Sequence, residues 1–406
     1  MLVVQKFGGT SVGDLERIEA VSKRVMKSVD AGDRVVVVVS AMSGETNKLV
    51  EYAHYFSDAP AHQEMDLLLS SGERVTSSLL SIALQSKGYK AVALTGRGAG
   101  IKTNGSHTKA RIEEIDPTVM NNHLDSGEVV VVAGFQGVSP DGKVSTLGRG
   151  GSDLSAVAVA GALKADLCEI YTDVDGVYTT DPRIEPKAKK LEKISYDEML
   201  ELASLGAKVL QSRSVELAKK LNVNLVTRSS FNENEGTLIT KEENMMEKPL
   251  VSGIALARNQ ARISLIGVSD RPGIASEIFT ALADADINID MIVQTIGHNQ
   301  NDSKTNMAFT VSADELKAAA SVVDGFKAND EVDVIEVDED ISKVSIVGVG
   351  MRSHTGVASK AFSALAKENI NIMMISTSEI KVSIIISQKY SELAVRTLHD
   401  AYNLDV

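Results

Sequence analysis

Short apolar runs rich in β-branched residues alternate with longer amphipathic stretches over the first 240 residues. The apolar runs are typical of buried strands, and the amphipathic stretches are typical of helices. The runs are LVVQ, RVVVVVS, AVALT, VVVVAG, CEIYT and NVNLVT, and the stretches between them are 14–31, 45–57, 62–87, 108–125, 152–164 and 195–220. This alternation predicts an α/β fold in which helices cover both faces of a mainly parallel sheet.

The last 150 residues contain an internal repeat. The segment 263–292 aligns with 344–375 if one two-residue insertion is allowed, and the alignment matches Gly267 to Gly348, Phe279 to Phe362 and Asn288 to Asn371. Each copy has the order of a strand, a glycine-containing turn, a helix and further strands. We therefore predict two small βαββαβ domains.

The second copy ends soon after its last helix, 391–402, and lacks a final strand. An unpaired strand candidate, VSGIALA at 251–257, precedes the first copy, so we expect it to complete the second copy and interleave the two domains. The predicted organisation is 1–240 for the first domain, 241–262 for a linker with the extra strand, 263–340 for the first repeat and 341–406 for the second.

Composition and charge exclude several classes of protein. The net charge of −13 argues against a partner with a phosphate backbone, because such partners require clustered basic residues. No apolar run approaches the roughly 18 residues of a membrane span, and Lys6 interrupts the start before a secretory hydrophobic region could form. We expect a cytoplasmic protein that binds neither nucleic acid nor membrane. Cys168 lies in an apolar strand and is expected to be inert, and the seven histidines show no metal-binding spacing.

Three motifs carry candidate chemistry. KFGGTS places Lys6 at a strand end before Gly8 and Gly9, where backbone N–H groups and a helix N-terminus could cradle phosphate, although a simple strand-to-helix turn explains KFGG equally well. LGRGGSD, 147–153, offers Arg149 for an anion, with Ser152 or Asp153 expected at the cap of the next helix. YTDVDGVYTTDPR, 171–183, follows a strand, where open α/β sheets bind ligands, but an ordinary surface turn would look similar.

These motifs, together with SAMSGETN at 40–47, SSGERV at 70–75, AGFQG at 133–137 and GAKVL at 206–210, resemble the aspartate kinase family of the amino-acid kinase superfamily. The resemblance covers the whole chain, and the repeats resemble ACT domains. The chain resembles the monofunctional form of the family rather than the fusion with homoserine dehydrogenase, because it has no additional region of dehydrogenase length. The family fold has a mainly parallel sheet sandwiched by helices and is followed by the two ACT-type domains.

The resemblance implies a role for each motif residue. ATP would be held by Lys6, Phe7, Gly8, Gly9, Thr172, Asp173, Tyr178, Arg183 and Lys208. L-Aspartate would be surrounded by Ser40, Thr46, Glu73, Arg149, Ser152 and Asp153, with Lys6, Asp153 and Lys208 as the catalytic set. Without the resemblance, Glu73 and Lys208 would be interpreted as solvated charges. Mg²⁺ is expected on ATP oxygens and water, with no protein metal site, and an already ionised carboxylate acceptor needs no general base.

The resemblance also implies feedback inhibition by lysine, threonine or both, and a homodimer or higher oligomer formed through the ACT domains. The effector positions are Asp270, Arg271, Pro272, Gly273, Ile274, Ala275, Asn288, Ile289, Asp290 and Gln294 in the first copy, and Ala358, Ser359, Asn371, Ile372, Ser378 and Glu379 in the second. The two sites need not be equivalent, because His354 and Thr355 replace the proline turn in the second copy.

Other functions are compatible with the same sequence. The acceptor could instead be glutamate, acetylglutamate or a nucleoside monophosphate, although the pair of Arg149 and Glu73 disfavours a nucleotide. The chain could also be a catalytically silent amino-acid sensor. An internal start near Met245 or Met246 could yield a separate regulatory subunit, and the role of Asp153, as orienter of lysines or contact to metal-bound water, is not decided by sequence.

Overall fold

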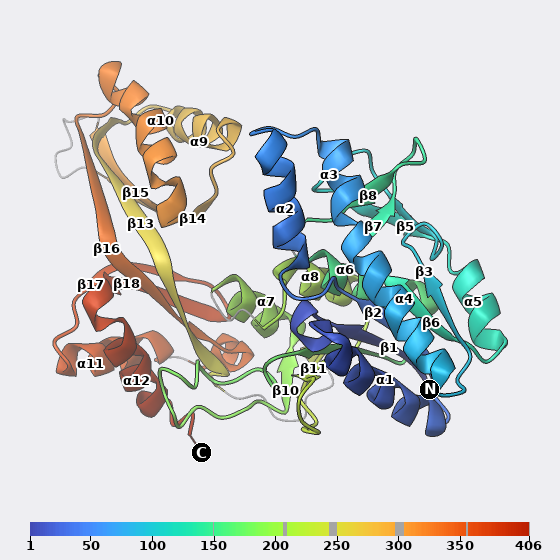
Figure 1. Cartoon of the computed structure of the whole chain (residues 1–406). Helices are drawn as coiled ribbons and strands as arrows, with labels where there is room; N and C mark the ends of the chain where they lie inside the picture. The colour runs from blue at the N-terminus through green and yellow to red at the C-terminus, as the bar shows by residue number, and fades with distance from the viewer. Residues whose placement is uncertain (149, 206–208, 243–249, 297–303, 355, 406) are drawn as a thin grey trace. The chain divides into compact units, whose positions relative to one another are not determined.

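The computed structural model of the protein describes the chain except residues 149, 206–208, 243–249, 297–303, 355 and 406. The chain forms two compact units (Figure 1). The first comprises Met1–Val177, Lys190–Ser204 and Lys208–Glu247, and the second comprises Tyr178–Lys189, Leu205–Ala207 and Lys248–Val406. Each unit is described by itself. Among the described residues, no helix combines the length and the apolar character needed to cross a membrane.

An eight-stranded sheet forms the centre of the first unit, in the order β10-β12-β11-β9-β1-β2-β6-β3. All neighbouring pairs are parallel except β11 with β12, so the predicted α/β class is confirmed. The strands are β1 (Leu2–Phe7), β2 (Arg34–Val39), β3 (Ala91–Leu94), β6 (Val129–Ala133), β9 (Leu167–Thr172), β10 (Lys193–Ser195), β11 (Leu225–Ser229) and β12 (Thr237–Thr240). The last of these lies in the polar stretch after residue 230, where the sequence predicts no strand.

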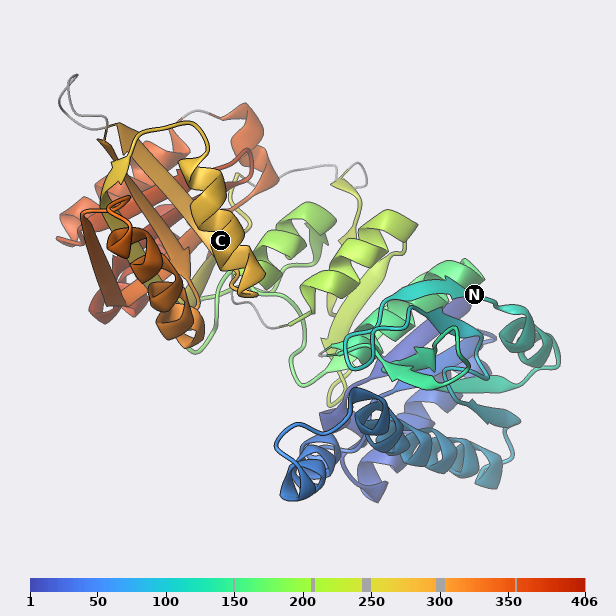
Figure 2. The ribbon, with the colours of Figure 1, turned by 90° about the horizontal axis from the view of Figure 1, so that it is seen from above.

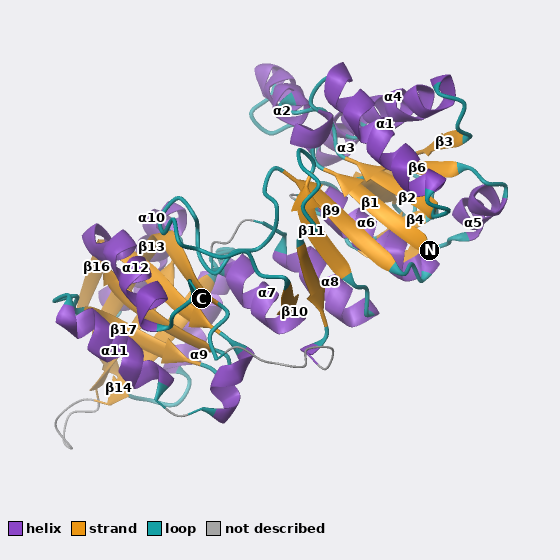
Figure 3. Ribbon diagram, turned by 90° about the horizontal axis from the view of Figure 1, so that it is seen from below, coloured by secondary structure: helices purple, strands orange, loops and turns teal. Residues whose placement is uncertain are grey.

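Helices cover both faces of this sheet (Figures 2 and 3). The helices of the first unit are α1 (Leu15–Asp30), α2 (Glu45–Phe56), α3 (His62–Leu69), α4 (Ser71–Ser86), α5 (Thr118–Asp125), α6 (Gly151–Leu163), α7 (Tyr196–Ser204) and α8 (Ser212–Leu221). Alternate residues of β2, Val35, Val37 and Val39, pack in one core with residues of α1 and α4, and α6 lies on the opposite face. Burial on both faces explains why the strand sequences are apolar throughout. Cys168, in β9, is fully buried, and burial raises the pKa of its thiol, as expected for an inert residue.

One of the predicted helical stretches is wrong in part. Only 118–125 of the stretch 108–125 is helical, because β5 (Ile112–Ile115) pairs with β4 (Ile101–Thr103) in a second sheet of order β5-β4-β7-β8. The other two strands are β7 (Gln136–Val138) and β8 (Val144–Thr146). Their short runs and half-exposed faces gave no strand signal. The stretch 62–87 is likewise two helices, which meet at Ser70.

The second unit has a six-stranded antiparallel sheet in the order β14-β15-β13-β16-β18-β17. Its elements are β13 (Gly253–Ser269), α9 (Ile274–Asp284), β14 (Ile289–Ile296), β15 (Lys304–Val311), α10 (Leu316–Ala328), β16 (Val334–Val347), α11 (Val357–Lys367), β17 (Ile372–Thr377), β18 (Lys381–Ser387) and α12 (Ser391–Ala401). Strands β13 and β16 are long enough to serve both repeats (Figure 1).

The pairing of β13 shows how the repeats are interleaved. Residues Gly253 to Ala257 pair with Lys343 to Val347, which begin the second repeat, whereas Arg262 to Ile266 pair with residues that end the first. This is the pairing that the interleaved arrangement requires. Each repeat has a separate apolar core: α9 and α10 cover one, and α11 and α12 cover the other.

The segment Tyr178–Lys189 belongs to the second unit although it follows β9 in sequence. Thr179 hydrogen-bonds His399 Nε2 through its hydroxyl at 2.9 Å and accepts the Ile254 N–H at 2.7 Å. The carbonyl oxygen of Ile184 accepts from Arg396, and the Ile184 side chain packs on the core of the second repeat. The segment Tyr178–Lys189, which includes the second half of the motif 171–183, is thus anchored on the second ACT-type repeat.

Candidate active site

The carboxyl ends of four parallel strands bring the sequence motifs to one edge of the large sheet. In register, Phe7 lies between Tyr171 and Val39, and Val39 lies beside Ala133. The residues that follow these positions, Thr172, Gly8, Ser40 and Gly134, therefore emerge at the same edge. Open α/β sheets bind their ligands at such an edge.

The KFGG turn packs closely on its surroundings, most tightly at Gly9. A Cβ on Gly9 would lie 3.0 Å from the carbonyl oxygen of Ala41, and one on Gly8 would lie 3.4 Å from Lys6 Nζ. The bare backbone therefore lies next to the lysine ammonium, as a phosphate cradle requires. The Phe7 side chain is fully buried and stacks on Tyr171, so only the backbone of Phe7 is available to a ligand.

Lys6 and Asp153 form an ion pair, with 2.5 Å between Nζ and Oδ1. The side chains are only 11% and 12% exposed, so the pair is largely withdrawn from water. Asp153 belongs to the first turn of α6, whose N-cap is Gly150 in the left-handed conformation without a side-chain cap. The expectation that Ser152 or Asp153 caps this helix is therefore wrong. Gly150 occupies the N-cap position, and its left-handed backbone conformation is one that glycine adopts readily. Asp153 pairs with the lysine instead.

Glu73 is buried in the first turn of α4, with 3% of its surface exposed. Its Oε1 accepts the N–H of Ala41 at 3.1 Å, while Oε2 is buried and has no hydrogen-bond partner among the described residues. Burial raises the pKa of Glu73 to about 7 from an ordinary value of 4.5. The interpretation of Glu73 as a solvated helix charge is therefore wrong, since a buried carboxylate with an unpartnered oxygen is costly unless a ligand supplies a donor.

The other predicted aspartate-binding residues lie near this group to different degrees. Ser40 follows β2 and donates its backbone N–H to the carbonyl of Phe7, and Ser152 packs so closely on Gly134 that a Cβ there would meet it at 3.1 Å. Thr46 lies at the start of α2, after Gly44 in the left-handed conformation. Arg149 and Lys208 lie outside the described residues.

The residues predicted for the nucleoside side of ATP divide between the two units. Thr172 ends β9 and donates its hydroxyl to the Asp173 carboxylate at 3.0 Å. Tyr178 and Arg183 belong to the second unit. Arg183 is held by Asp181 through Nε and Nη2, and its side chain is 90% exposed.

The predicted effector residues of the first repeat surround the turn before α9. Gly273 adopts φ +100° there, as this turn requires. Arg271 is held by the Glu277 carboxylate through two hydrogen bonds, of 2.7 and 2.6 Å. Asp290 forms an ion pair with the buried ammonium of Lys343. The other predicted positions fall into two groups. Asp270, Pro272, Ile274 and Ala275 lie next to this turn in the sequence, and Asn288, Ile289 and Gln294 lie just before or on β14, where Gln294 is exposed.

A hollow of about 490 Å³ lies beside the corresponding turn of the second repeat. Ala358, Ser378 and Glu379 of the predicted set line it, together with Arg352, whose Nε lies 3.4 Å from Glu379 Oε2. Ser359 is next to the turn glycine, and Asn371 and Ile372 lead into β17. A hollow with a guanidinium and a carboxylate offers complementary charges to both ends of an amino acid.

Sequence reasoning missed residues that contact the candidate site residues and hold them in place. Gly134 permits the close approach of Ser152 to the sheet, Ala41 supplies the N–H that holds Glu73, and Asp66 lies at the centre of a buried hydrogen-bond network. The signals in the sequence were weak, because glycine after a strand and aspartate in a helix are both common. Their importance depends on contacts between distant segments.

Comparison with known proteins agrees with this geometry. Residues 1–228 match the amino acid kinase family, and residues 263–325 and 344–402 match the ACT domain. The fold and the site together therefore define a kinase of the amino acid kinase type that carries a pair of ACT domains.

The relatives narrow this class. The aspartokinase of Helicobacter pylori strain ATCC 700392 / 26695 is 61% identical over 409 residues and covers 100% of both chains. The crystal structure of Escherichia coli aspartokinase III in complex with aspartate and ADP (R-state) has a TM-score of 0.80 at 27% identity, over 99% of both chains. The structure of the same enzyme with lysine and aspartate (T-state) has a TM-score of 0.79 at 28% identity, over 98% of this chain and 99% of that one. The chain belongs to the aspartokinase family.

Proposed function

We propose that the protein is a cytoplasmic enzyme that transfers the γ-phosphoryl group of Mg-ATP to the β-carboxylate of L-aspartate. The product is 4-phospho-L-aspartate, and the reaction begins the biosynthesis of lysine, by way of diaminopimelate, and of threonine and methionine. The observation that carries the proposal is that groups suited to phosphate and groups suited to aspartate lie at the same edge of the large sheet. A buried Lys6–Asp153 ion pair lies beside a glycine cradle, and the carboxylate of Glu73 has an unpartnered buried oxygen.

The phosphate groups of ATP would bind at Lys6, Gly8 and Gly9, with Lys208 as a second cation. Asp153 would hold the Lys6 ammonium at the turn, because the two groups are already in contact at 2.5 Å. A cation fixed before the substrate arrives stabilises the charge that moves during phosphoryl transfer without reorganisation. Asp153 would thus act by orienting lysine rather than by moving a proton.

Aspartate would bind with its ammonium at Glu73 and its α-carboxylate at Arg149. The buried Oε2 of Glu73 lacks a donor that an ammonium would supply, and a planar guanidinium suits a carboxylate. Ser40, Thr46 and Ser152 would complete the pocket. The β-carboxylate then remains to face the γ-phosphate.

The chemistry needs no general base, because a side-chain carboxylate with a pKa of about 3.9 is already ionised at neutral pH. The demand is to hold two anions in line and neutralise their repulsion. Magnesium prefers oxygen ligands and keeps several waters, so ATP oxygens would supply its direct ligands and Asp153 would reach it through water. The ion, when bound, would neutralise part of the charge on the transferred group.

The nucleoside side of ATP would meet Thr172, Asp173, Tyr178 and Arg183. Thr172 lies at the carboxyl end of β9, next to the glycine turn that follows β1. The exposed Arg183 guanidinium is pre-oriented by Asp181, which reduces the freedom that it would lose on binding ATP.

Lysine, threonine or both would inhibit by binding at the ACT domains. The hollow beside Arg352 and Glu379 is a candidate site in the second repeat, and the lysine-bound structure of the Escherichia coli relative is consistent with an amino-acid effector. In the first repeat Asp290 already pairs with Lys343. An effector ammonium would therefore compete with Lys343 or bind the exposed Asp270.

Gln294→Ala tests the site of the first repeat. Gln294 is exposed on β14, so the change should relieve inhibition while kcat and the KM values stay unchanged. Inhibition curves for lysine and threonine provide the measurement, with the exposed Gln388→Ala in the same unit as a matched control. Curves identical to those of the unmodified protein would remove Gln294 from the effector site.

We further propose a homodimer or higher oligomer formed through the ACT domains. The sheet edges support this proposal, since Ile292 on β14 and Ile375 on β17 expose 52% and 43% of their surface. Exposed apolar edge strands readily pair with a second chain. Light scattering on the intact protein would give the oligomeric state, and a monomer at every concentration would contradict the proposal.

The defining experiment is Mg-ATP-dependent formation of an acyl phosphate, trapped with hydroxylamine, with aspartate, glutamate and acetylglutamate as acceptors. Each reaction would be run with and without lysine and threonine. Activity on aspartate alone, suppressed by either effector, is the expected result. Activity on another acceptor would show that Glu73 and Arg149 are misassigned, and inactivity with every acceptor would indicate a silent sensor.

A further inference from the structure

We propose that Asp66 is a positioning residue for aspartate binding, acting through a buried network with His107, Thr108 and Thr146. The inference rests on the proposed function, because it assigns these residues to the same substrate pocket. Among the described residues, the hydrogen bonds of the Asp66 carboxylate reach neither the glycine cradle nor the Lys6–Asp153 pair. Its role would be to hold the two parts of the chain that carry the groups for aspartate.

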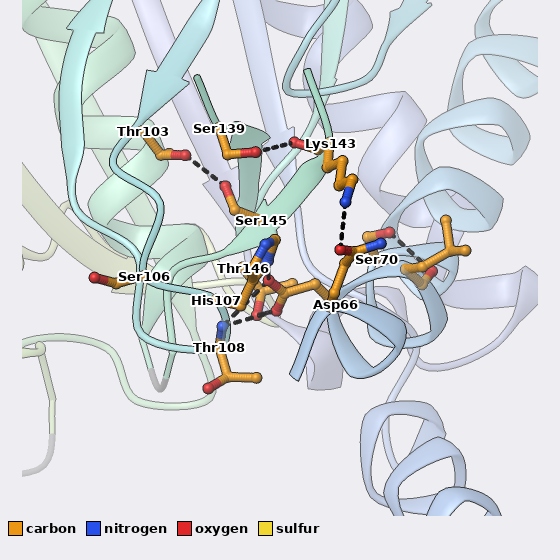
Figure 4. Close-up of polar contacts among 12 residues, drawn as sticks. Asp66, Ser70, Thr103, Ser106, His107, Thr108, Ser139, Lys143, Ser145 and Thr146 are labelled. Carbon is orange, nitrogen blue, oxygen red and sulfur yellow. Dashed lines mark hydrogen bonds and ion pairs between the residues drawn. The ribbon is translucent and has the colours of Figure 1, made fainter. Parts of the chain in front are cut away.

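The Asp66 carboxylate, in the middle of α3, is fully buried and is surrounded by donors (Figure 4). Its Oδ2 lies 2.6 Å from His107 Nδ1, and its Oδ1 accepts the Thr146 hydroxyl at 2.5 Å. The N–H of Thr108 reaches both oxygens, at 3.0 and 3.2 Å. A charge held by this many donors is rigid, because each of its contacts would have to be broken for it to move.

The helix that the Asp66 carboxylate anchors leads to Glu73. The backbone carbonyl of Asp66 accepts the N–H of Ser70 at 3.0 Å in the last turn of α3, and α4 begins at the next residue, with Glu73 in its first turn. Gln136 donates to the carbonyl of Ser70 at 3.0 Å in a buried contact. The start of α4 is therefore fixed to α3 and to the small sheet.

The network also leads toward Arg149. Thr146 ends β8, three residues before Arg149 in the sequence, and its carbonyl accepts the N–H of Ala110 at 2.9 Å. A Cβ on Gly148 would lie 3.3 Å from the carbonyl of Thr108, so the segment 107–110 packs closely against the segment 146–148. Asp66 thus joins α3 to both segments at a single carboxylate.

The backbone of Thr108 gives independent support. Thr108 has φ +64°, in the left-handed region that a β-branched residue rarely adopts. Strain of this kind persists only where the surroundings over-determine the conformation, and it clusters at functional sites. The Asp66 carboxylate accepts the N–H of this same residue and so helps to hold the strained turn.

The consequence should appear in the KM for aspartate. If the first turn of α4, which carries Glu73 as the ammonium partner, is displaced, aspartate loses its fit, whereas the glycine cradle of ATP is unaffected. Small displacements of binding groups can reduce activity by about a hundredfold. A purely structural network would instead affect stability without distinguishing between the two substrates.

The test uses a pair of substitutions in the full-length protein. Thr146→Val keeps the shape of the side chain and removes the donor, whereas Thr146→Ser keeps the donor and loses a methyl group. We expect Thr146→Val to raise the KM for aspartate by about tenfold, with kcat and the KM for ATP within about twofold of the original. Thr146→Ser should restore the KM for aspartate. Equal changes in both KM values, or no change with Val, would overturn the proposal.

His107 offers a second pair of variants if Thr146→Val fails to fold. The His107 ring is 19% exposed, so Gln and Ala should be tolerated. Ala removes a donor to Asp66 and should raise the KM for aspartate selectively, while Gln can keep it, and equal KM values for the two variants would overturn the proposal. If the unmodified protein forms no hydroxamate with aspartate, the proposed function itself fails. That outcome is recognised before any variant is made.

Discussion

Two carboxylates occupy the same place in their helices but lie in opposite electrostatic surroundings. Glu73 is the third residue of α4 and Asp153 is the third residue of α6, and a glycine lies in the first turn of each helix. Both are largely buried, at 3% and 9% exposure. Asp153 contacts the ammonium of Lys6, whereas Oε2 of Glu73 has no partner among the described residues.

The difference indicates which charges the protein supplies for each of the two substrates. On the phosphate side, the protein supplies both charges, so the lysine is oriented before ATP arrives. On the aspartate side, the protein supplies only the anion and leaves the cation to the substrate. A helix N-terminus favours a carboxylate by about 0.3–1 kcal/mol. Burial outweighs this effect at Glu73, since its pKa rises to about 7.

The largest effect should follow from removing the lysine of the paired side. Lys6→Met keeps most of the side-chain volume but takes away the charge that stabilises phosphoryl transfer. We expect kcat to fall by about 10²- to 10³-fold, the range found when one electrostatic donor is removed from an active site. Steady-state kinetics with Mg-ATP and aspartate would measure it, with Lys23→Met, at an exposed lysine of α1, as the control.

The free energy of unfolding of Lys6→Met also tests the contrast between Asp153 and Glu73. Lys6→Met leaves Asp153 buried without its partner, the situation that Glu73 already has, so the free energy of unfolding should fall by about 3–5 kcal/mol. The double variant Lys6→Met/Asp153→Asn should recover much of that loss without recovering activity. Recovery of activity would show that the pair is structural and not catalytic.

The second effect concerns the unpaired side. Glu73→Gln keeps the shape of the side chain and an acceptor for the Ala41 N–H, but it cannot pair with an ammonium ion. Loss of a buried charged partner corresponds to about 2–5 kcal/mol, so the KM for aspartate should rise by at least about 30-fold while the KM for ATP stays constant. Glu64→Gln is the matched control, because Glu64 is also the third residue of its helix but is exposed.

Stability should change in the opposite direction. At pH 8 the unbound protein carries an ionised carboxylate whose burial opposes ionisation, so Glu73→Gln should raise the free energy of unfolding by about 1–3 kcal/mol. At pH 5.5 the original residue is protonated in the folded state but still mostly ionised in the unfolded chain, so the gain should fall to roughly half, and it should vanish below about pH 4.5, where both states are protonated. A variant that is less stable at both pH values would show that Glu73 serves the fold and not the substrate.

Much of this site was predictable from the sequence. Lys6, Gly8 and Gly9 follow an apolar strand and precede a helix, so both the sheet edge and the turn could be inferred from local pattern. The interleaving of the repeats was predictable as well, because the second repeat lacks a strand and 251–257 supplies one. These features depend on neighbouring residues or on counting elements, which sequence patterns report directly.

Burial of single polar residues was not predictable. A glutamate in an amphipathic helix is usually solvated, and only the fold shows that Glu73 lies beneath the loop after β2, where Gly72 contacts Ala41 so closely that a Cβ would approach it to 2.7 Å. The small sheet was missed for a related reason, since three- and four-residue strands with half-exposed faces lack a clear period. Asp66 shows the same limit, because its partners lie 41 to 80 residues away.

The smallest predicted effect is the pH dependence of aspartate binding, which separates the two carboxylates most directly. Burial raises the pKa of Glu73, so the unbound protein holds a proton there below about pH 7. The ammonium of aspartate favours the ionised form and lowers this pKa, so binding below pH 7 must release that proton. Affinity for aspartate therefore weakens as the pH falls.

With a pKa of about 7, the ionised fraction of Glu73 falls about tenfold between pH 8 and pH 6, and the KM for aspartate should rise about tenfold over the same interval. Steady-state kinetics at saturating Mg-ATP would show this rise, and Glu73→Gln should make the profile flat. Because titration of ATP affects both proteins equally, the difference between the two profiles isolates Glu73. Parallel profiles would mean that the substrate ammonium is bound by another group, and the contrast between the two carboxylates would then have no part in substrate recognition.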